Sequence, residues 1–343
     1  MSTTILGRFR QGLGIGIGLA VLVYVGYTLF VGWDKVAGAL GAFDWRWLPL
    51  LLALSLVNYG IRFIRWEYYL RLLDIRISLK TSAAVFLAGL AMTITPGKVG
   101  EFLKSYLLKE SEGVPMARSA PVVFAERLSD LLALVLLAAL GVTTYGKESA
   151  DYGGPDPTPI LLLTGVGLAV GIAVLQSQGL TNTVLGLVSK VPGLRGIVPK
   201  IREATDASRD LLSWKPLVVG LTLSAIAWYS ECAEYLLVFR GFGVDTVSQG
   251  VAVFGYAFST VAGVVSPGGI GPTDVGLIEI AQYFTPELRG RDDVATAASF
   301  IVRFSTLWFA VILGAVALLR FRRFVEVDVD EARPTAPDES PAG

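Results

Sequence analysis

Residues 95–101, TPGKVGE, and residues 266–274, SPGGIGPTD, are two short clusters that interrupt apolar runs and that each carry an ionisable side chain. Proline and glycine break helices. Non-helical backbone occurs at membrane depth only where protein or a water-filled cavity surrounds it. Two such breaks in corresponding places of two halves indicate a transporter's binding site. We therefore expect two broken-helix elements that face a shared polar cavity, with the breaks at Pro96, Gly97, Gly100, Pro267, Gly268, Gly269 and Gly271.

Composition places the chain in a membrane. Of its 343 residues, 53% are hydrophobic and only 17% are charged. Several apolar runs approach about 20 residues, the length that spans a bilayer, so we predict an all-α polytopic membrane protein. The chain contains no histidine, which excludes Ser-His or Cys-His catalysis and His-ligated metal sites. We expect no metal, no cofactor and no nucleic-acid partner, and we expect Cys232 to pack in a helix.

Hydropathy predicts about six full spans plus two re-entrant helical hairpins. The spans are expected near 12–31, 47–60, 119–141, 159–176, 216–239 and 295–319. The apolar segments beside the breaks are too short to cross a membrane, so each pair is expected to form a hairpin; they are 83–94 with 102–108, and 251–265 with 275–284. Residues 32–46 are expected to be a loop. The basic and aromatic residues of 62–80 are expected to anchor the second span at the cytoplasmic interface.

Charge bias chooses between two topologies. If each broken element crossed the membrane once, the basic loop 178–215 would lie outside. If each is a hairpin, all the basic segments are cytoplasmic and the acidic loop 146–158 is outside, as the positive-inside rule requires. The hairpins then enter from opposite sides, and each precedes a long helix with a buried arginine. This layout is an inverted repeat.

The resulting domain plan is one transmembrane domain over 1–323, with both termini in the cytoplasm. Its first half covers about 1–176 and its second half about 216–323. The halves are joined by a cytoplasmic linker, 178–215, part of which has helical spacing and suits the membrane surface. The acidic, proline-containing segment 324–343 is expected to be a disordered tail.

Four charges inside predicted spans require partners. Glu126, Arg127 and Asp130 share one helix, and a charge at the bilayer centre costs roughly 2.5–3.5 kcal/mol. They form either a structural ion cluster or the lining of a polar substrate path. Arg303 is a lone cation in the last span, and Asp274 or Glu279 is its expected partner. That pair is either structural or part of a site for a lipid phosphate.

Charges near the breaks complete the candidate site. Glu101 begins a short helix, where it either caps the helix or meets the substrate. Lys98 and Lys104 either reach an anionic headgroup or snorkel to the interface. Glu231, Glu234, Asn58 and Arg62 are assigned to the ends of spans. No catalytic residue is predicted, and the substrate-binding candidates are Lys98, Glu101, Lys104, Glu126, Arg127, Asp130, Asp274 and Arg303.

Three motifs in this order resemble those of a known family. PGxxGE at 96–101, ERxxD at 126–130 and PGGIGxxD at 267–274 resemble the transmembrane domain of the lysylphosphatidylglycerol synthetase family, also called flippase-like. The resemblance covers about 10–320. It implies lipid handling, because in full-length synthetases this domain resembles a flippase for aminoacylated phosphatidylglycerol, while a separate soluble domain makes the lipid. We expect neither that synthetase domain nor a fused glycosyltransferase domain here.

The function that follows is an integral membrane lipid translocase-like protein of the cell membrane, without enzymatic activity. It would handle a phospholipid or lipid-linked headgroup, with Arg127, Arg303 and Lys98 on the phosphate. The alternatives are a membrane enzyme or an accessory scaffold acting on polyprenyl-phosphate or lipid-linked sugars. A scaffold would have a separately encoded synthetase or glycosyltransferase as its partner. Asp34 and Asp44 are too far apart to suggest an acidic catalytic pair, and the sequence does not identify the lipid or the oligomeric state.

Overall fold

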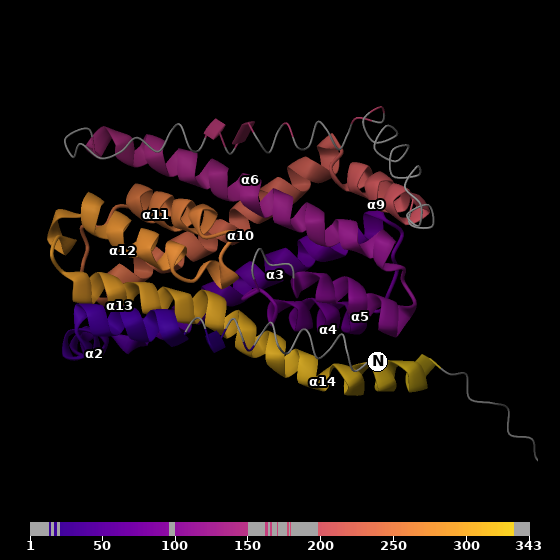
Figure 1. Ribbon diagram of the computed structural model, residues 1–343, viewed down its shortest axis with the longest axis horizontal. Helices are drawn as coiled ribbons and strands as arrows, with labels where there is room; N and C mark the ends of the chain where they lie inside the picture. The colour runs from indigo at the N-terminus through magenta and orange to yellow at the C-terminus, as the bar shows by residue number, and fades with distance from the viewer. Residues whose placement is uncertain are drawn as a thin grey trace, which may run out of the picture.

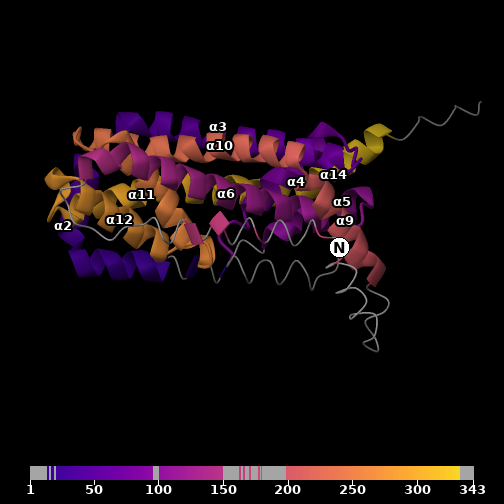
Figure 2. The same ribbon diagram turned by 90° about the horizontal axis from the view of Figure 1, so that it is seen from above.

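The computed structural model describes residues 21–95, 100–149 and 198–332, together with isolated positions before 21 and between 150 and 197. Every regular element in these ranges is helical, which confirms the predicted all-α class for the described residues. The helices run mostly along one long axis, as Figure 1 and Figure 2 show. They are α2 (Trp33–Ala42), α3 (Leu48–Leu72), α4 (Leu79–Leu90), α5 (Leu103–Glu112), α6 (Met116–Ser149), α9 (Val198–Leu211), α10 (Trp214–Gly241), α11 (Gln249–Ala262), α12 (Pro272–Phe284), α13 (Asp292–Arg303) and α14 (Phe309–Ala332).

Short helical turns connect some of these elements. η1 (Trp45–Trp47) leads into α3, η4 (Pro267–Gly269) lies in the second break, and η5 (Pro286–Leu288) follows α12. The π-helical turn η6 (Phe304–Trp308) joins α13 to α14 without interrupting the helix.

Three of the described helices are long and apolar enough to cross a membrane: Trp45–Leu72, Trp214–Gly241 and Asp292–Phe321. α6, with 34 residues, also exceeds the roughly 20 that a bilayer requires. The span expected at 159–176 lies almost wholly outside the described residues, so the total of six spans stays a prediction.

Two predictions about the first half are wrong. α3 is a single helix of 25 residues, so Arg62 and Arg65 lie in its interior, where both are buried. They are not interfacial anchors, because α3 continues past both residues and the bundle encloses them, which a hydropathy pattern does not reveal. Residues 32–46 are also not simply a loop, because α2 forms there and buries Val36 and Ala39.

On the two sides of each break lie short helices that pack against each other, α4 with α5 and α11 with α12. In the second hairpin, Phe254 of α11 contacts Phe284 of α12 far from the break, with ring centroids 6.1 Å apart. In the first hairpin, α4 packs against α5. The two hairpins lie at opposite ends of the long axis (Figure 1). Their tips meet near the middle, where Ile94 and Ile270 belong to one small hydrophobic cluster.

The packing of the long helices relates the two halves. α6, which follows the first hairpin, packs against α11 of the second, and α14 packs against α4 of the first. α3 and α10, which precede the hairpins, pack together. Glycines allow α6 to approach α11 and α14 to approach α4 closely. A Cβ on Gly141 would lie 2.6 Å from the Phe254 nitrogen, and one on Gly314 would lie 2.8 Å from the Ala91 Cα. Each half thus packs a long helix against the first helix of the other half's hairpin, whereas the inverted repeat stays a prediction.

Two further segments were expected to lie outside the bundle. The helical spacing near 197–213 is confirmed, since α9 forms there and packs on α6 (Figure 1). α14 continues to Ala332, so the segment expected to be a tail from 324 begins as helix. Residues 333–343 lie outside the described residues.

Candidate functional site

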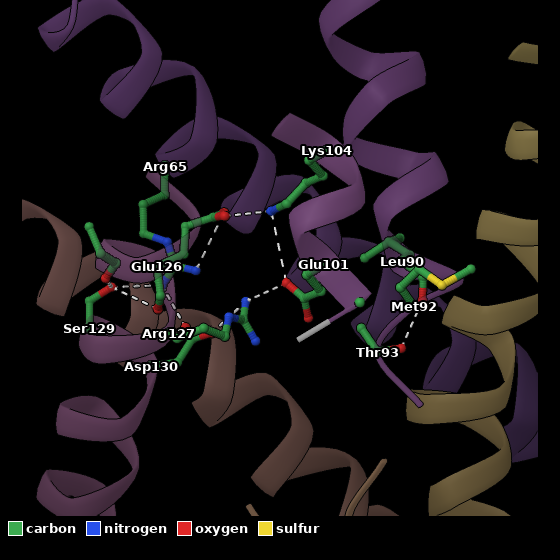
Figure 3. Close-up of polar contacts among 12 residues, drawn as sticks. Arg65, Leu90, Met92, Thr93, Glu101, Lys104, Glu126, Arg127, Ser129 and Asp130 are labelled. Atoms are coloured by element: carbon green, nitrogen blue, oxygen red, sulfur yellow. Dashed lines mark hydrogen bonds and ion pairs between the residues drawn. The ribbon is translucent and has the colours of Figure 1, made fainter. Parts of the chain in front are cut away.

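Six charged side chains gather where α3, α5 and α6 meet (Figure 3). We call them the ion cluster: Arg65, Glu101, Lys104, Glu126, Arg127 and Asp130. All but Arg127 are almost completely buried, and the three cations balance the three carboxylates in number. Burial at this depth is affordable because every member has an oppositely charged neighbour.

Asp130 connects α6 to α3. Its Oδ1 accepts a hydrogen bond from Arg65 Nη1 at 2.5 Å, and its Oδ2 lies 3.0 Å from Arg127 Nη2. Arg65 Nη1 also donates to the Ser224 hydroxyl on α10. The guanidinium of Arg65 therefore ties α3 to both α6 and α10.

Glu126 and Glu101 connect α6 to the start of the first hairpin's second helix. Lys104 donates to Glu126 and lies over the Trp66 ring, 4.5 Å from its centroid. Glu101 Oε2 lies 3.2 Å from Arg127 Nη2 and 3.9 Å from Lys104 Nζ. Lys104 is only 2% exposed, so the alternative that it snorkels to the interface is wrong.

Arg303 pairs with Asp274, as predicted. Arg303 Nε lies 3.2 Å from Asp274 Oδ1, and its Nη2 donates to the Gly268 carbonyl. Asp274 Oδ2 accepts from the Gly271 backbone N–H at 2.9 Å, which caps the start of α12. Glu279, the other expected partner, is exposed. Gly268 and Gly271 in this break both have positive φ, a backbone conformation that glycine adopts without strain.

The π-helical turn directly after Arg303 is held by α3. A π-turn changes the local hydrogen-bond register of a helix and is frequent at functional sites. The Ser55 hydroxyl donates to the Ser305 carbonyl at 2.7 Å, and the Tyr59 hydroxyl donates to the Thr306 carbonyl at 2.6 Å. These bonds satisfy buried carbonyls and position Arg303 beside the interior.

A central cavity of about 420 Å³ lies between the tips of the hairpins. Its charged lining consists of Arg62, Arg127, Asp130, Glu231 and Arg303, and its aromatic lining consists of Tyr59, Phe124, Trp228 and Tyr256. Phe124 on α6 is 41% exposed and Val264, just after α11, is 39% exposed. The wall of the cavity therefore continues onto the apolar outer surface between these two segments.

The predicted site residues divide into three groups. Arg127, Asp130 and Arg303 line the cavity. Glu101, Lys104, Glu126 and Asp274 do not line it, and each is ion-paired to a neighbouring side chain. Lys98, with Pro96 and Gly97, lies outside the described residues.

Sequence reasoning missed Arg62, Arg65 and Glu231. Glu231 and Glu234 were assigned to a span end, but both are buried, and Glu231 lines the cavity. The sequence does contain a pattern that could have placed the two arginines inside the bundle. Arg62 and Arg65 are three residues apart and share a helix face with Trp66 and Tyr69. Among the described residues, no three Cys, Asp or Glu gather in a way that could hold a metal ion.

Comparison with known proteins gives relatives from archaea. A UPF0104 membrane protein of Methanothermobacter thermautotrophicus is 23% identical over 326 residues, which cover 88% of this chain and 95% of that protein. A UPF0104 membrane protein of Methanocaldococcus jannaschii is 24% identical over 226 residues, 65% of this chain and 91% of that protein. No solved structure matches the chain.

A third relative carries the name of an enzyme. Glycosyltransferase AglD of Haloferax volcanii is 27% identical over 328 residues, which cover 84% of this chain. They cover 50% of AglD, so the chain spans about half of that protein.

A known family also matches most of the chain. The family described as "Lysylphosphatidylglycerol synthase TM region" matches residues 13–314. That range includes both hairpins, the ion cluster and the central cavity. The chain therefore belongs to the lysylphosphatidylglycerol synthase transmembrane-region family.

Proposed function

We propose that this membrane protein is a lipid translocase-like protein that binds a phosphate-containing lipid headgroup in the central cavity. The observation that carries the proposal is the position of that cavity. It lies between two hairpin tips that approach from opposite ends of the bundle, and arginines line it. A charged headgroup crossing the bilayer needs such a polar site near mid-depth.

The two halves contribute comparable groups to the headgroup site. Arg127 comes from the helix after the first hairpin, and Arg303 comes from the helix after the second. Glu101 and Asp130 orient Arg127, and Asp274 orients Arg303. A planar guanidinium held in this way presents paired N–H donors that match phosphate oxygens.

The lipid tails need not enter the cavity. Phe124 and Val264 form part of its wall and are also exposed on the outside of the bundle. A headgroup inside the cavity would have its acyl chains leave between α6 and the tip of the second hairpin. In this proposal the headgroup follows the polar path while the tails stay in the lipid.

The test is a scrambling assay in reconstituted liposomes. Fluorescent phospholipids with anionic, zwitterionic and lysylated headgroups are compared for the wild type and Arg127→Met, each shown to be folded by gel filtration. We expect headgroup-dependent movement that the variant loses. Arg71→Met is the matched control, because Arg71 is exposed near the end of α3. A folded wild type that moves no lipid would contradict the proposal.

The second candidate is a membrane enzyme or accessory scaffold acting on polyprenyl-phosphate or lipid-linked sugars. The similarity to AglD, which is named a glycosyltransferase, favours it. The same cavity would then receive the phosphate of a lipid-linked sugar. Turnover of such a sugar lipid by the purified protein would support an enzyme. An effect in cells that disappears when a separately encoded synthetase or glycosyltransferase is deleted would support a scaffold.

A further inference from the structure

Arg62 differs from the other buried arginines of the bundle. It lies inside α3, is 5% exposed and lines the central cavity. Arg65, Arg127 and Arg303 each form an ion pair. Among the described residues, no carboxylate oxygen lies within 4.0 Å of the Arg62 guanidinium, and no acceptor receives its hydrogen bonds.

Among the described residues, the charge of Arg62 acts on Asp130 across the cavity without forming an ion pair with it. Its Nε is buried without a hydrogen-bond partner. Two carboxylates line the same cavity, but Asp130 is already paired with Arg65 and Arg127. Glu231, on α10, accepts a hydrogen bond from Tyr256. An unpaired buried cation is strongly unfavourable, so a side chain of this kind in a cavity indicates a missing anion.

We propose that Arg62 is the principal ligand for a phosphate group in the central cavity, and that this phosphate belongs to a lipid headgroup. The bound phosphate supplies a negative charge in direct contact with Arg62, which the described residues do not provide within ion-pair distance. This inference rests on the proposed function and deepens it, because it assigns the anion to one residue. It also implies that lipids with uncharged headgroups are not ligands.

A phosphate ligand and a purely structural side chain at position 62 would change the stability of the empty protein in opposite directions when replaced. Replacing Arg62 by Met removes an uncompensated buried charge and leaves a side chain of similar length. The empty protein should therefore become more stable while the bound state is lost. If Arg62 held the fold together, the same change would destabilise the protein.

The experiment measures the apparent melting temperature and ligand binding of the purified protein in mild detergent. The probes are water-soluble short-chain phosphatidylglycerol, inorganic phosphate and short-chain diacylglycerol, which has no phosphate. We expect the phosphatidylglycerol to stabilise the wild type and the diacylglycerol to have no effect. Arg62→Met should melt at a higher temperature without ligand and bind at least about tenfold more weakly, since a charged hydrogen bond contributes about that much.

Two variants control for charge and for position. Arg62→Lys keeps the buried cation, so it should show no gain in melting temperature and should bind more weakly than the wild type because the bidentate geometry is lost. Arg71→Met lies on the exposed part of the same helix and should behave as the wild type.

The outcomes separate this inference from the proposed function. Equal stabilisation by inorganic phosphate would overturn the lipid assignment, whereas stabilisation by the phospholipid alone would support it. Arg62→Met that melts lower and binds normally would overturn the role of Arg62. If Arg62→Met moved lipid as fast as the wild type, the role of Arg62 would also be overturned, but the proposed translocase function would stand. Arg62-dependent binding without any lipid movement would contradict the translocase alone.

Discussion

The ion cluster places six charges in the interior of a membrane bundle, and its pairing is what makes this possible. Lys104 donates to Glu126 and has Glu101 3.9 Å away. Removing one partner of a buried pair leaves an uncompensated charge, which typically costs about 3–5 kcal/mol. We expect Lys104→Met to lower the free energy of unfolding by about 3 kcal/mol, measured by titration from mild detergent into a denaturing one.

A second substitution tests whether the loss comes from the charge. In Lys104→Met with Glu126→Gln, the carboxylate that lost its partner is neutral, so part of the stability should return. A single variant as stable as the wild type would show that water, rather than Lys104, compensates Glu126. A double variant that is less stable than the single one would assign the loss to packing over Trp66.

At the level of residues, the sequence shows which charges lie in apolar runs and need partners, but it identifies only some of those partners. Arg303 with Asp274 could be predicted, because one lone cation and a carboxylate in the neighbouring break leave few choices. Arg62 and Arg65 were misplaced, because two arginines in the second half of an apolar run look like the end of a span. Only the fold shows that α3 continues past them and that Asp130, from a distant helix, meets Arg65.

Close contacts between elements depend on single glycines. Gly141 lies against the backbone of α11, and Gly314 lies against the backbone at the end of α4. A methyl group at either position would overlap backbone atoms and force the helices apart. We expect Gly141→Ala and Gly314→Ala each to destabilise the protein by about 1–3 kcal/mol in the same unfolding titration.

Replacing a glycine that has free space around it should not lower the free energy of unfolding. Gly60 lies in α3 with nothing within 4 Å of the position that a Cβ would take. Gly60→Ala should therefore be neutral or stabilising by up to about 1 kcal/mol, because alanine favours the helix. If all three variants behaved alike, the packing of α6 against α11 and of α14 against α4 would not depend on the absence of a side chain at Gly141 and Gly314.

At the level of elements, the short helices on both sides of each break could be predicted, because proline and glycine interrupt apolar runs that are too short to span a bilayer. The helix α2 could not, because its buried face consists of Val36 and Ala39 only and its flanks are charged. The π-helical turn also left no pattern in the sequence, since it depends on Ser55 and Tyr59 of a distant helix. Local signals predict where a helix breaks, whereas tertiary contacts decide how it continues.

For the whole molecule, charge is distributed unequally between the two ends of the long axis. The end that holds α9 and the open end of the first hairpin carries Arg71, Arg76, Lys80, Lys109, Arg118, Arg202, Arg209, Lys215 and Arg320, interspersed with Asp74, Glu110, Glu112, Glu203, Asp206 and Asp210, so the two ends differ mainly in their basic residues. The opposite end carries Lys35, Arg46, Arg240, Arg289 and Arg291, interspersed with Asp34, Asp44, Asp245, Glu287, Asp292 and Asp293. By the positive-inside rule, we propose that the first end faces the cytoplasm of a cell-membrane protein.

This orientation can be tested with single cysteines. Cys232 is buried and is first replaced by Ala. Arg76→Cys, between α3 and α4, and Asp245→Cys, between α10 and α11, then place exposed thiols at opposite ends of the bundle. We expect a membrane-impermeant maleimide to label position 245 in intact cells and to label position 76 only after the membrane is opened.

The outcome decides whether the two hairpins enter from opposite sides of the membrane. The open end of the first hairpin lies with position 76 and that of the second with position 245, so opposite labelling would place their meeting tips near mid-depth. That is where a headgroup crossing between leaflets needs polar contacts. Labelling of both positions from one side would mean that the long axis does not cross the bilayer, and the central cavity would then lie near one surface, where it could bind a headgroup but not pass it across.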